Sequence, residues 1–188
     1  MRTLSLTLGL CALLVACGGG GASTACVSEY WDGSIGTCLP EDWKVVEKSA
    51  LEQRGVPPEV VVAFQAEQPV SGQFPTVTVT REALTEEIEP TQYSELSVQS
   101  VRGIPQYEEI DDREITIDDE TVHLHIFSAQ PREEEPKAKF YQVSVALGTT
   151  GYSYTAALPL GVEDDLEDQV LLILENATLL PPTEEEEG

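Results

Sequence analysis

Apolar and polar residues alternate along most of the middle of this chain. The clearest example is 76–80, where threonine and valine alternate strictly, as expected of a strand with one buried face. Similar segments follow one another, separated by short runs of Asp, Glu, Pro and Gly that are typical of turns. The strands expected on this basis are 44–47, 59–66, 76–80, 106–117, 121–128, 139–147 and 152–157.

Two segments have the period of an α-helix instead. In 162–177 apolar residues recur at helical spacing, and acids occupy the first turn, where the helix dipole favours negative charge. The segment 91–103 has a looser pattern and ends at a Gly-Ile-Pro sequence. Its apolar face is expected to consist of Tyr93, Leu96, Val101 and Ile104. One further helical turn is expected over 49–54.

Strands joined by turns, with one helix between them and another at the end, predict an antiparallel sheet with helices packed on it. The expected fold class is α+β, with an antiparallel sheet of about six strands flanked by helices, an N-terminal disulfide hairpin and a C-terminal amphipathic helix. With 41% apolar residues the chain can bury a substantial core. We expect one domain over 26–180 and an acidic disordered tail over 181–188.

The N-terminal segment has the features of an export signal. The first three residues, Met1-Arg2-Thr3, form a short positive region, and 4–15 is apolar but too short for a transmembrane helix, which needs ~20 residues. Leu14-Val15-Ala16-Cys17 then resembles the lipobox of bacterial lipoproteins. That resemblance implies a signal peptide over 1–16, a diacylglycerol on Cys17, and a Gly-rich tether over 17–25. The alternative is an ordinary secretory signal that is cut within the Gly-Ala-Ser stretch after the cysteine.

The expected location follows from the lipobox. Two or three acyl chains hold a protein firmly at a membrane, so the chain is expected to be anchored in the lipid bilayer through acylated Cys17. Gly18 occupies the position at which an Asp marks inner-membrane retention in enteric lipoproteins. We therefore expect the protein in the cell envelope. It would lie in the outer membrane, facing the periplasm, if there are two membranes, and otherwise on the outer face of the cell membrane.

The four cysteines divide between the signal and the mature chain. Cys11 leaves with the signal and Cys17 carries the lipid, so Cys26 and Cys38 remain as an even pair in an exported chain. We predict that they form a disulfide, worth about 3 kcal/mol in the chain-entropy model. Metal binding by the pair is the alternative, but the neighbouring sequence contains no histidine to complete a zinc site.

The charge balance is strongly acidic, with 34 Asp and Glu against 10 Lys and Arg and a formal net charge of −24. Such a chain is not suited to binding nucleic acid, whose phosphates need a basic surface, or to adsorbing on anionic lipid headgroups. Two interpretations of the acidity remain open. In the first, the acidic residues serve solubility or adaptation to a salty habitat. In the second, they form a docking face for a basic partner or a weak divalent-cation site.

The only two histidines, His123 and His125, are two residues apart in a predicted strand. They therefore project from one face, as two metal ligands would, while Val122, Leu124 and Ile126 point to the core on the other face. A third ligand would come from one of the many carboxylates. The alternative is a pair of imidazoles on a partly exposed sheet face that bind no ligand.

Other chemistry is poorly represented. Acidic runs at 108–112 and 118–120 could attract Ca²⁺, but they lack EF-hand spacing, and solvated hairpin ends explain them better. The chain has no Gly-x-Ser-x-Gly sequence, and two neighbouring histidines on one strand do not build a triad. We predict no catalytic residue and no cofactor. Trp31, on the hairpin near the tether, is the residue we expect to be an exposed partner contact.

Aromatic residues mark successive elements in a characteristic order. Pro40-x-x-Trp43 follows the first hairpin, and a helix around Tyr93 lies mid-chain. Later segments continue the order with Phe140-Tyr141-Gln142, Gly151-Tyr152-Ser153-Tyr154-Thr155 and Glu175-Asn176-Ala177-Thr178. Over 27–180 this order resembles the PsbP-like α/β/α sandwich superfamily, which includes photosystem II PsbP and bacterial lipoproteins of the DcrB and LpqN types. Ala-Thr stands where the superfamily usually has Ser-Phe near the C-terminus. The resemblance implies the sandwich fold and a binding or assembly role rather than catalysis, although one fold hosts many roles.

Together these features predict a lipid-anchored exported protein whose domain acts as a non-enzymatic binding or assembly module for a protein partner in the cell envelope. The first alternative is a metal- or small-ligand-binding lipoprotein that uses His123, His125 and nearby acids. The second alternative is a hydrolase with a site made of scattered carboxylates.

Overall fold

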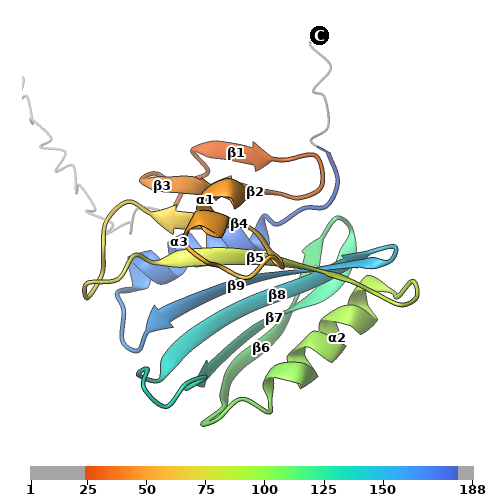
Figure 1. Ribbon diagram of the computed structural model, residues 1–188. Helices are drawn as coiled ribbons and strands as arrows, with labels where there is room; N and C mark the ends of the chain where they lie inside the picture. Colours follow the sequence, from red (N-terminus) through yellow and green to blue (C-terminus); the bar gives the residue numbers. More distant parts are fainter. Residues whose placement is uncertain (1–23, 182–188) are drawn as a thin grey trace, which may run out of the picture.

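The computed structural model describes residues 24–181, which form two antiparallel sheets. The larger sheet has seven strands in the spatial order β3-β4-β5-β9-β8-β7-β6 (Figure 1). In that order they are β3 (Trp43–Glu47), β4 (Val60–Ala66), β5 (Thr76–Ala83), β9 (Thr150–Pro159), β8 (Ala138–Leu147), β7 (Glu120–Ala129) and β6 (Glu108–Ile117). The smaller sheet is the hairpin of β1 (Ser28–Trp31) and β2 (Gly36–Leu39).

The predicted α+β class and antiparallel sheet are confirmed. The sheet has seven strands rather than about six, because the short strand β3 pairs along its whole length with β4 and forms one edge. The predicted disulfide between Cys26 and Cys38 is present and closes the N-terminal hairpin. The predicted signal peptide, Cys17 and the tail beyond residue 181 lie outside the described residues.

Helices cover both faces of the large sheet. They are α1 (Lys48–Gln53), α2 (Pro90–Val101) and α3 (Asp164–Glu175). The helix α3 and the hairpin β1–β2 lie against one face, and α1 and α2 lie against the other (Figure 1). The chain crosses from β5 to the far edge strand β6 through α2, so α2 lies over β7 and β8. Within residues 24–181, no helix is long and apolar enough to span a bilayer.

The sheet face toward α3, which we call the apolar face, forms the main core. Every second residue along each strand points toward this face. The fully buried side chains on it include Phe64, Val77, Val79, Leu124, Tyr141, Val143 and Tyr154. The helix buries the residues that its spacing predicts, namely Leu166, Val170, Ile173 and Leu174. Burying one apolar side chain of this size contributes about 1.5–3 kcal/mol. This face is therefore the largest source of folding energy in the described domain.

The hairpin is fixed to the apolar face at Gly36. The Tyr154 hydroxyl donates a hydrogen bond of 3.0 Å to the Gly36 carbonyl oxygen, and Gly36 also exchanges two backbone hydrogen bonds with Thr178. A Cβ atom at position 36 would lie 2.7 Å from the Tyr30 carbonyl oxygen and 2.9 Å from the Thr178 side chain. Only glycine fits this close approach, so the hairpin, the sheet and the chain after α3 meet at one point.

The helix α2 does not bury the face that its apolar residues predict. The side chains that it buries are Tyr93, Ser94 and Val98. Leu96, which was expected to face inward, is 48% exposed. The sheet surface below α2 is polar: Ser144 Oγ lies 2.7 Å from Ser97 Oγ of the helix and 2.8 Å from Ser153 Oγ of the next strand. Serines therefore face inward because they hydrogen-bond to this surface, which we call the polar face.

A two-residue turn between β6 and β7 holds the C-terminal segment. Its residues Asp118 and Asp119 have φ angles of 51° and 67°, in the left-handed region that such turns require and that glycine or asparagine usually fills. The Asp118 carboxylate accepts hydrogen bonds of 2.6 Å from the Thr178 hydroxyl and from the Leu179 backbone N–H. These bonds offset the backbone strain at Asp118, whereas Asp119 is exposed to solvent.

Glycine substitutions at these two aspartates should have opposite effects on the stability of the protein. We expect Asp119→Gly to raise the free energy of unfolding by about 0.5–1 kcal/mol, because glycine adopts a positive φ without steric strain. We expect Asp118→Gly to lower it by about 1–2 kcal/mol, because the same relief is outweighed by two lost hydrogen bonds. Urea unfolding of both variants measures the two changes. If both substitutions change the free energy of unfolding in the same direction, the Asp118 carboxylate does not compensate the backbone strain at that residue.

Candidate functional site

A β-bulge in the edge strand β6 brings two carboxylates to the polar face. The register with β7 shifts between Glu109 and Asp111, so Ile110 is an extra residue without a partner and is 50% exposed. In a regular strand, residues three apart such as Glu109 and Asp112 would point to opposite faces. The bulge places both on the same face, which is a common use of bulges near functional sites.

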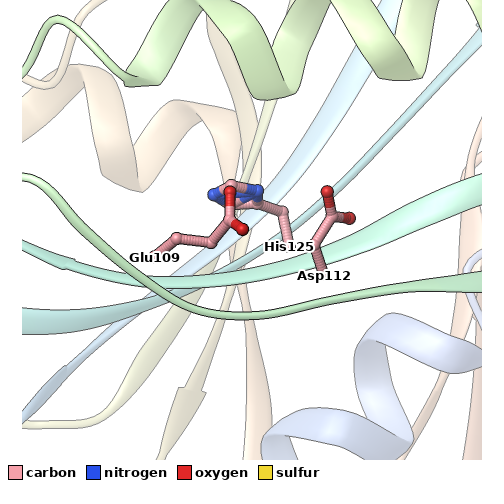
Figure 2. A group of neighbouring side chains, drawn as sticks. All are labelled: Glu109, Asp112 and His125. Carbon is pink, nitrogen blue, oxygen red and sulfur yellow. The ribbon is translucent and has the colours of Figure 1, made fainter.

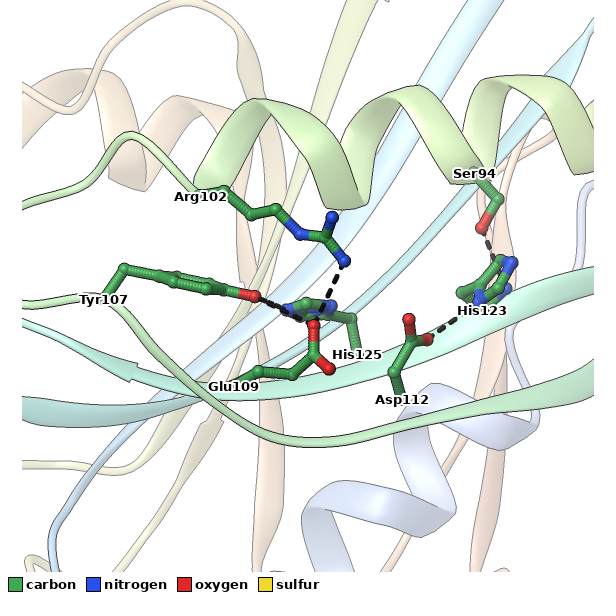
Figure 3. Close-up of polar contacts among 7 residues, drawn as sticks. All are labelled: Ser94, Arg102, Tyr107, Glu109, Asp112, His123 and His125. Atoms are coloured by element: carbon green, nitrogen blue, oxygen red, sulfur yellow. Dashed lines mark hydrogen bonds and ion pairs between the residues drawn. The ribbon is translucent and has the colours of Figure 1, made fainter.

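The two histidines lie opposite these acids on β7. His125 is paired with Asp112 and His123 with Glu114, so both imidazoles are on the polar face, as the sequence predicts. The neighbouring Val122, Leu124 and Ile126 are in the main core, also as predicted. The expectation of a partly exposed pair is wrong for one member, because His125 is 0% exposed. It lies beneath α2 with Tyr107 beside it (Figure 3).

Each histidine has its own set of partners. His123 Nδ1 lies 2.7 Å from Asp112 Oδ1, and its backbone N–H donates to Ser94 Oγ at 2.8 Å. His125 Nε2 lies 3.0 Å from the Tyr107 hydroxyl. The network continues to Glu109, whose Oε2 accepts from the Tyr107 hydroxyl at 3.3 Å and from the Arg102 guanidinium at 3.2 Å (Figure 3).

His125 is held in its neutral form by its surroundings. Burial lowers the pKa of His125, and the nearby charges of Asp112 and Glu109 oppose that shift without reversing it. The rings of Phe127 and His125 pack edge to face, with centroids 5.0 Å apart. While Nε2 is next to Tyr107, Nδ1 is buried and has no hydrogen-bond partner among the described residues.

Three potential metal ligands converge around this imidazole. A ring nitrogen of His125 and one carboxylate oxygen each from Glu109 and Asp112 lie within 4.8 Å of one another (Figure 2). His123 is not part of the group, since its Nδ1 contacts Asp112 instead. Of the two histidines that the sequence suggests as metal ligands, His125 is therefore in this group and His123 is not. The sequence did not single out the two acids, because no local pattern revealed the bulge at Ile110.

The polar face also contains a serine, a histidine and an aspartate in contact, but they do not form a catalytic triad. Ser94 is 1% exposed, and its Oγ accepts the backbone N–H of His123 rather than facing the imidazole of a general base. A nucleophile has to be hydrogen-bonded to its base and reachable by substrate. Ser94 instead fixes α2 to β7.

Trp31 lies in a different part of the molecule from the histidines. It is half-buried rather than exposed, which corrects the sequence-based expectation, because it packs against Gly36 across the hairpin. Together with Tyr30, the disulfide and Leu180 it lines an open cleft of about 890 Å³ beside the turn at 118–119. One of the acidic runs therefore contributes to this cleft and the other to the histidine site.

Comparison with known proteins gives a result for the fold only. No protein-family model and no curated protein sequence matches this chain. The solved structure of LpqN, involved in cell envelope biogenesis of Mycobacterium tuberculosis, superposes with a TM-score of 0.62 at 17% identity, covering 82% of this chain and 90% of LpqN. The solution structure of cyanobacterial PsbP (CyanoP) from Synechocystis sp. PCC 6803 superposes with a TM-score of 0.52 at 13% identity, covering 89% of this chain and 99% of CyanoP. These similarities confirm the predicted sandwich architecture: the chain has the PsbP-like fold.

Proposed function

We propose that the protein is a lipid-anchored, non-enzymatic binding or assembly module of the cell envelope. The observation that carries this proposal is the Leu14-Val15-Ala16-Cys17 sequence, which follows a short apolar segment and precedes a Gly-rich tether and the folded domain. Two further observations support it. LpqN, which shares the fold, is involved in cell envelope biogenesis, and the Ser94–His123 contact serves packing rather than catalysis.

The tether limits how far the domain can move from the membrane. Six residues, 18–23, lie between Cys17 and Thr24, which is the first described residue, so seven residue steps separate the two. At ~3.5 Å per extended residue the tether spans at most ~25 Å. The hairpin β1–β2, which comes next in the chain, is therefore the part of the domain held nearest the bilayer. The chain as a whole has a net charge of −24, so anionic headgroups repel the protein and the acyl chains alone provide attachment.

The cleft beside the hairpin is the surface we propose for the partner. A half-buried tryptophan in a concave site offers a large aromatic area with little loss of side-chain entropy, and Trp is common among the residues that dominate interface energies. Tyr30 and Leu180 extend the apolar part of the same cleft, while Glu29 and Asp119 give it an acidic rim. This composition suits a partner that presents an apolar side chain flanked by basic residues.

Replacement of the lipidated cysteine tests the anchor. We expect Cys17→Ser to move the protein from the membrane fraction to the soluble fraction, because the thiol that accepts the diacylglycerol is gone. The matched control is Cys11→Ser, which alters the apolar part of the signal and should leave the protein in the membrane fraction. Equal membrane association of both variants after a carbonate wash would contradict the proposed anchor.

Site-specific photocrosslinking tests the partner surface. A benzophenone amino acid at Trp31 should give a discrete crosslinked product in intact cells, because this residue lies in the proposed contact. The same group at Phe74, which is 48% exposed in the β4–β5 loop and does not line the Trp31 cleft, is the control and should not give that product. Identical products at both positions, or none at Trp31, would rule out this cleft as the docking surface.

A further inference from the structure

We propose that His125, Glu109 and Asp112 bind one divalent transition-metal ion of the Zn²⁺ or Mn²⁺ class. The three donor atoms already lie within 4.8 Å of one another and come from two adjacent strands, so little rearrangement is needed to close them around an ion (Figure 2). One imidazole with two carboxylates is a mixed nitrogen and oxygen ligand set, which suits these ions. This site is independent of the lipid anchor and of the Trp31 cleft.

The unsatisfied nitrogen of His125 is the observation that distinguishes this site from an ordinary acidic surface. A buried polar atom without a hydrogen bond costs about 1–3 kcal/mol, and His125 Nδ1 is such an atom within the described part of the chain. Metal-binding histidines usually coordinate through one nitrogen while the other donates to a neighbouring acceptor. The Tyr107 hydroxyl, 3.0 Å from Nε2, is placed to accept that hydrogen bond while it donates to Glu109.

The charges around the site also favour a cation. Glu109 and Asp112 bring two negative charges; Arg102 offsets the charge of Glu109, and Asp112 Oδ1 lies 2.7 Å from His123 Nδ1. The Arg102–Glu109 pair is at the surface, with side chains 52% and 45% exposed, so it contributes at most about 1 kcal/mol and is readily exchanged for a metal ion.

The supporting groups are arranged as a second layer around the three ligands. His123 Nδ1, 2.7 Å from Asp112 Oδ1, orients one carboxylate, while Tyr107 lies between His125 and Glu109 (Figure 3). Both carboxylates belong to residues that are exposed at the edge strand β6, so an ion reaches the site from solvent. The remaining coordination positions are then open to water.

Calorimetric titration of the full chain in detergent with ZnCl₂ and with MnCl₂, in 150 mM NaCl, tests this proposal. We expect one site per chain for at least one of the two ions, and at least tenfold weaker binding for Glu109→Gln and for Asp112→Asn. Both substitutions are at exposed positions and keep the side-chain volume, so circular dichroism should show an unchanged fold. His125→Gln should abolish the site if that variant folds.

Glu134→Gln is the matched control, since it removes one charge from an exposed acidic run in the β7–β8 loop and should not change the affinity. Equal affinity in Glu109→Gln, Asp112→Asn and Glu134→Gln would show nonspecific binding to an acidic surface and would overturn the proposal. So would the absence of heat with both ions at micromolar concentration.

Discussion

The burial of one face of the seven-stranded sheet against α3 and the disulfide hairpin holds the rest of the molecule in place. Tyr154 shows how the parts are joined, because its ring is fully buried in the core while its hydroxyl bonds the hairpin backbone at Gly36. Thr178, in the segment after α3, forms hydrogen bonds with the same glycine. The Asp118 carboxylate in turn accepts hydrogen bonds from Thr178 and Leu179. The hairpin, the sheet and the C-terminal segment therefore form one cooperative unit.

Because the apolar face supplies the main core, the opposite face can be polar. There α2 meets serines and histidines instead of a second large apolar surface, and Ser94 and Ser97 make the contacts that leucines would make elsewhere. A buried polar surface is stable only where its hydrogen bonds are satisfied. Most of the described groups meet this condition, but His125 Nδ1 and Gln142 Oε1 of the paired strand do not, and the His125 ring lies beside two carboxylates. One of these unsatisfied side chains thus belongs to the proposed metal site.

Simple periodicity was enough to predict most of the fold. The alternation in 76–80 and the helical spacing of Leu166, Val170 and Ile173 identified elements whose apolar side chains do face the core. It was also enough to place His123 and His125 on one face. Three features could not be predicted in this way. The bulge at Ile110 has no local sequence signature, the inward face of α2 depends on the polar sheet below it, and the burial of Trp31 depends on the glycine across the hairpin.

In the function proposed above, a lipid on Cys17 joins the acidic domain to a membrane, and this modification can be measured directly. The intact mass of protein extracted from bacterial membranes, with fragmentation of its N-terminal peptide, reports both the cleavage site and the modification. We expect a chain that begins at Cys17 and carries a diacylglyceryl group on that thiol. A chain that begins after Cys17, or one that retains an unmodified Cys17, would contradict it.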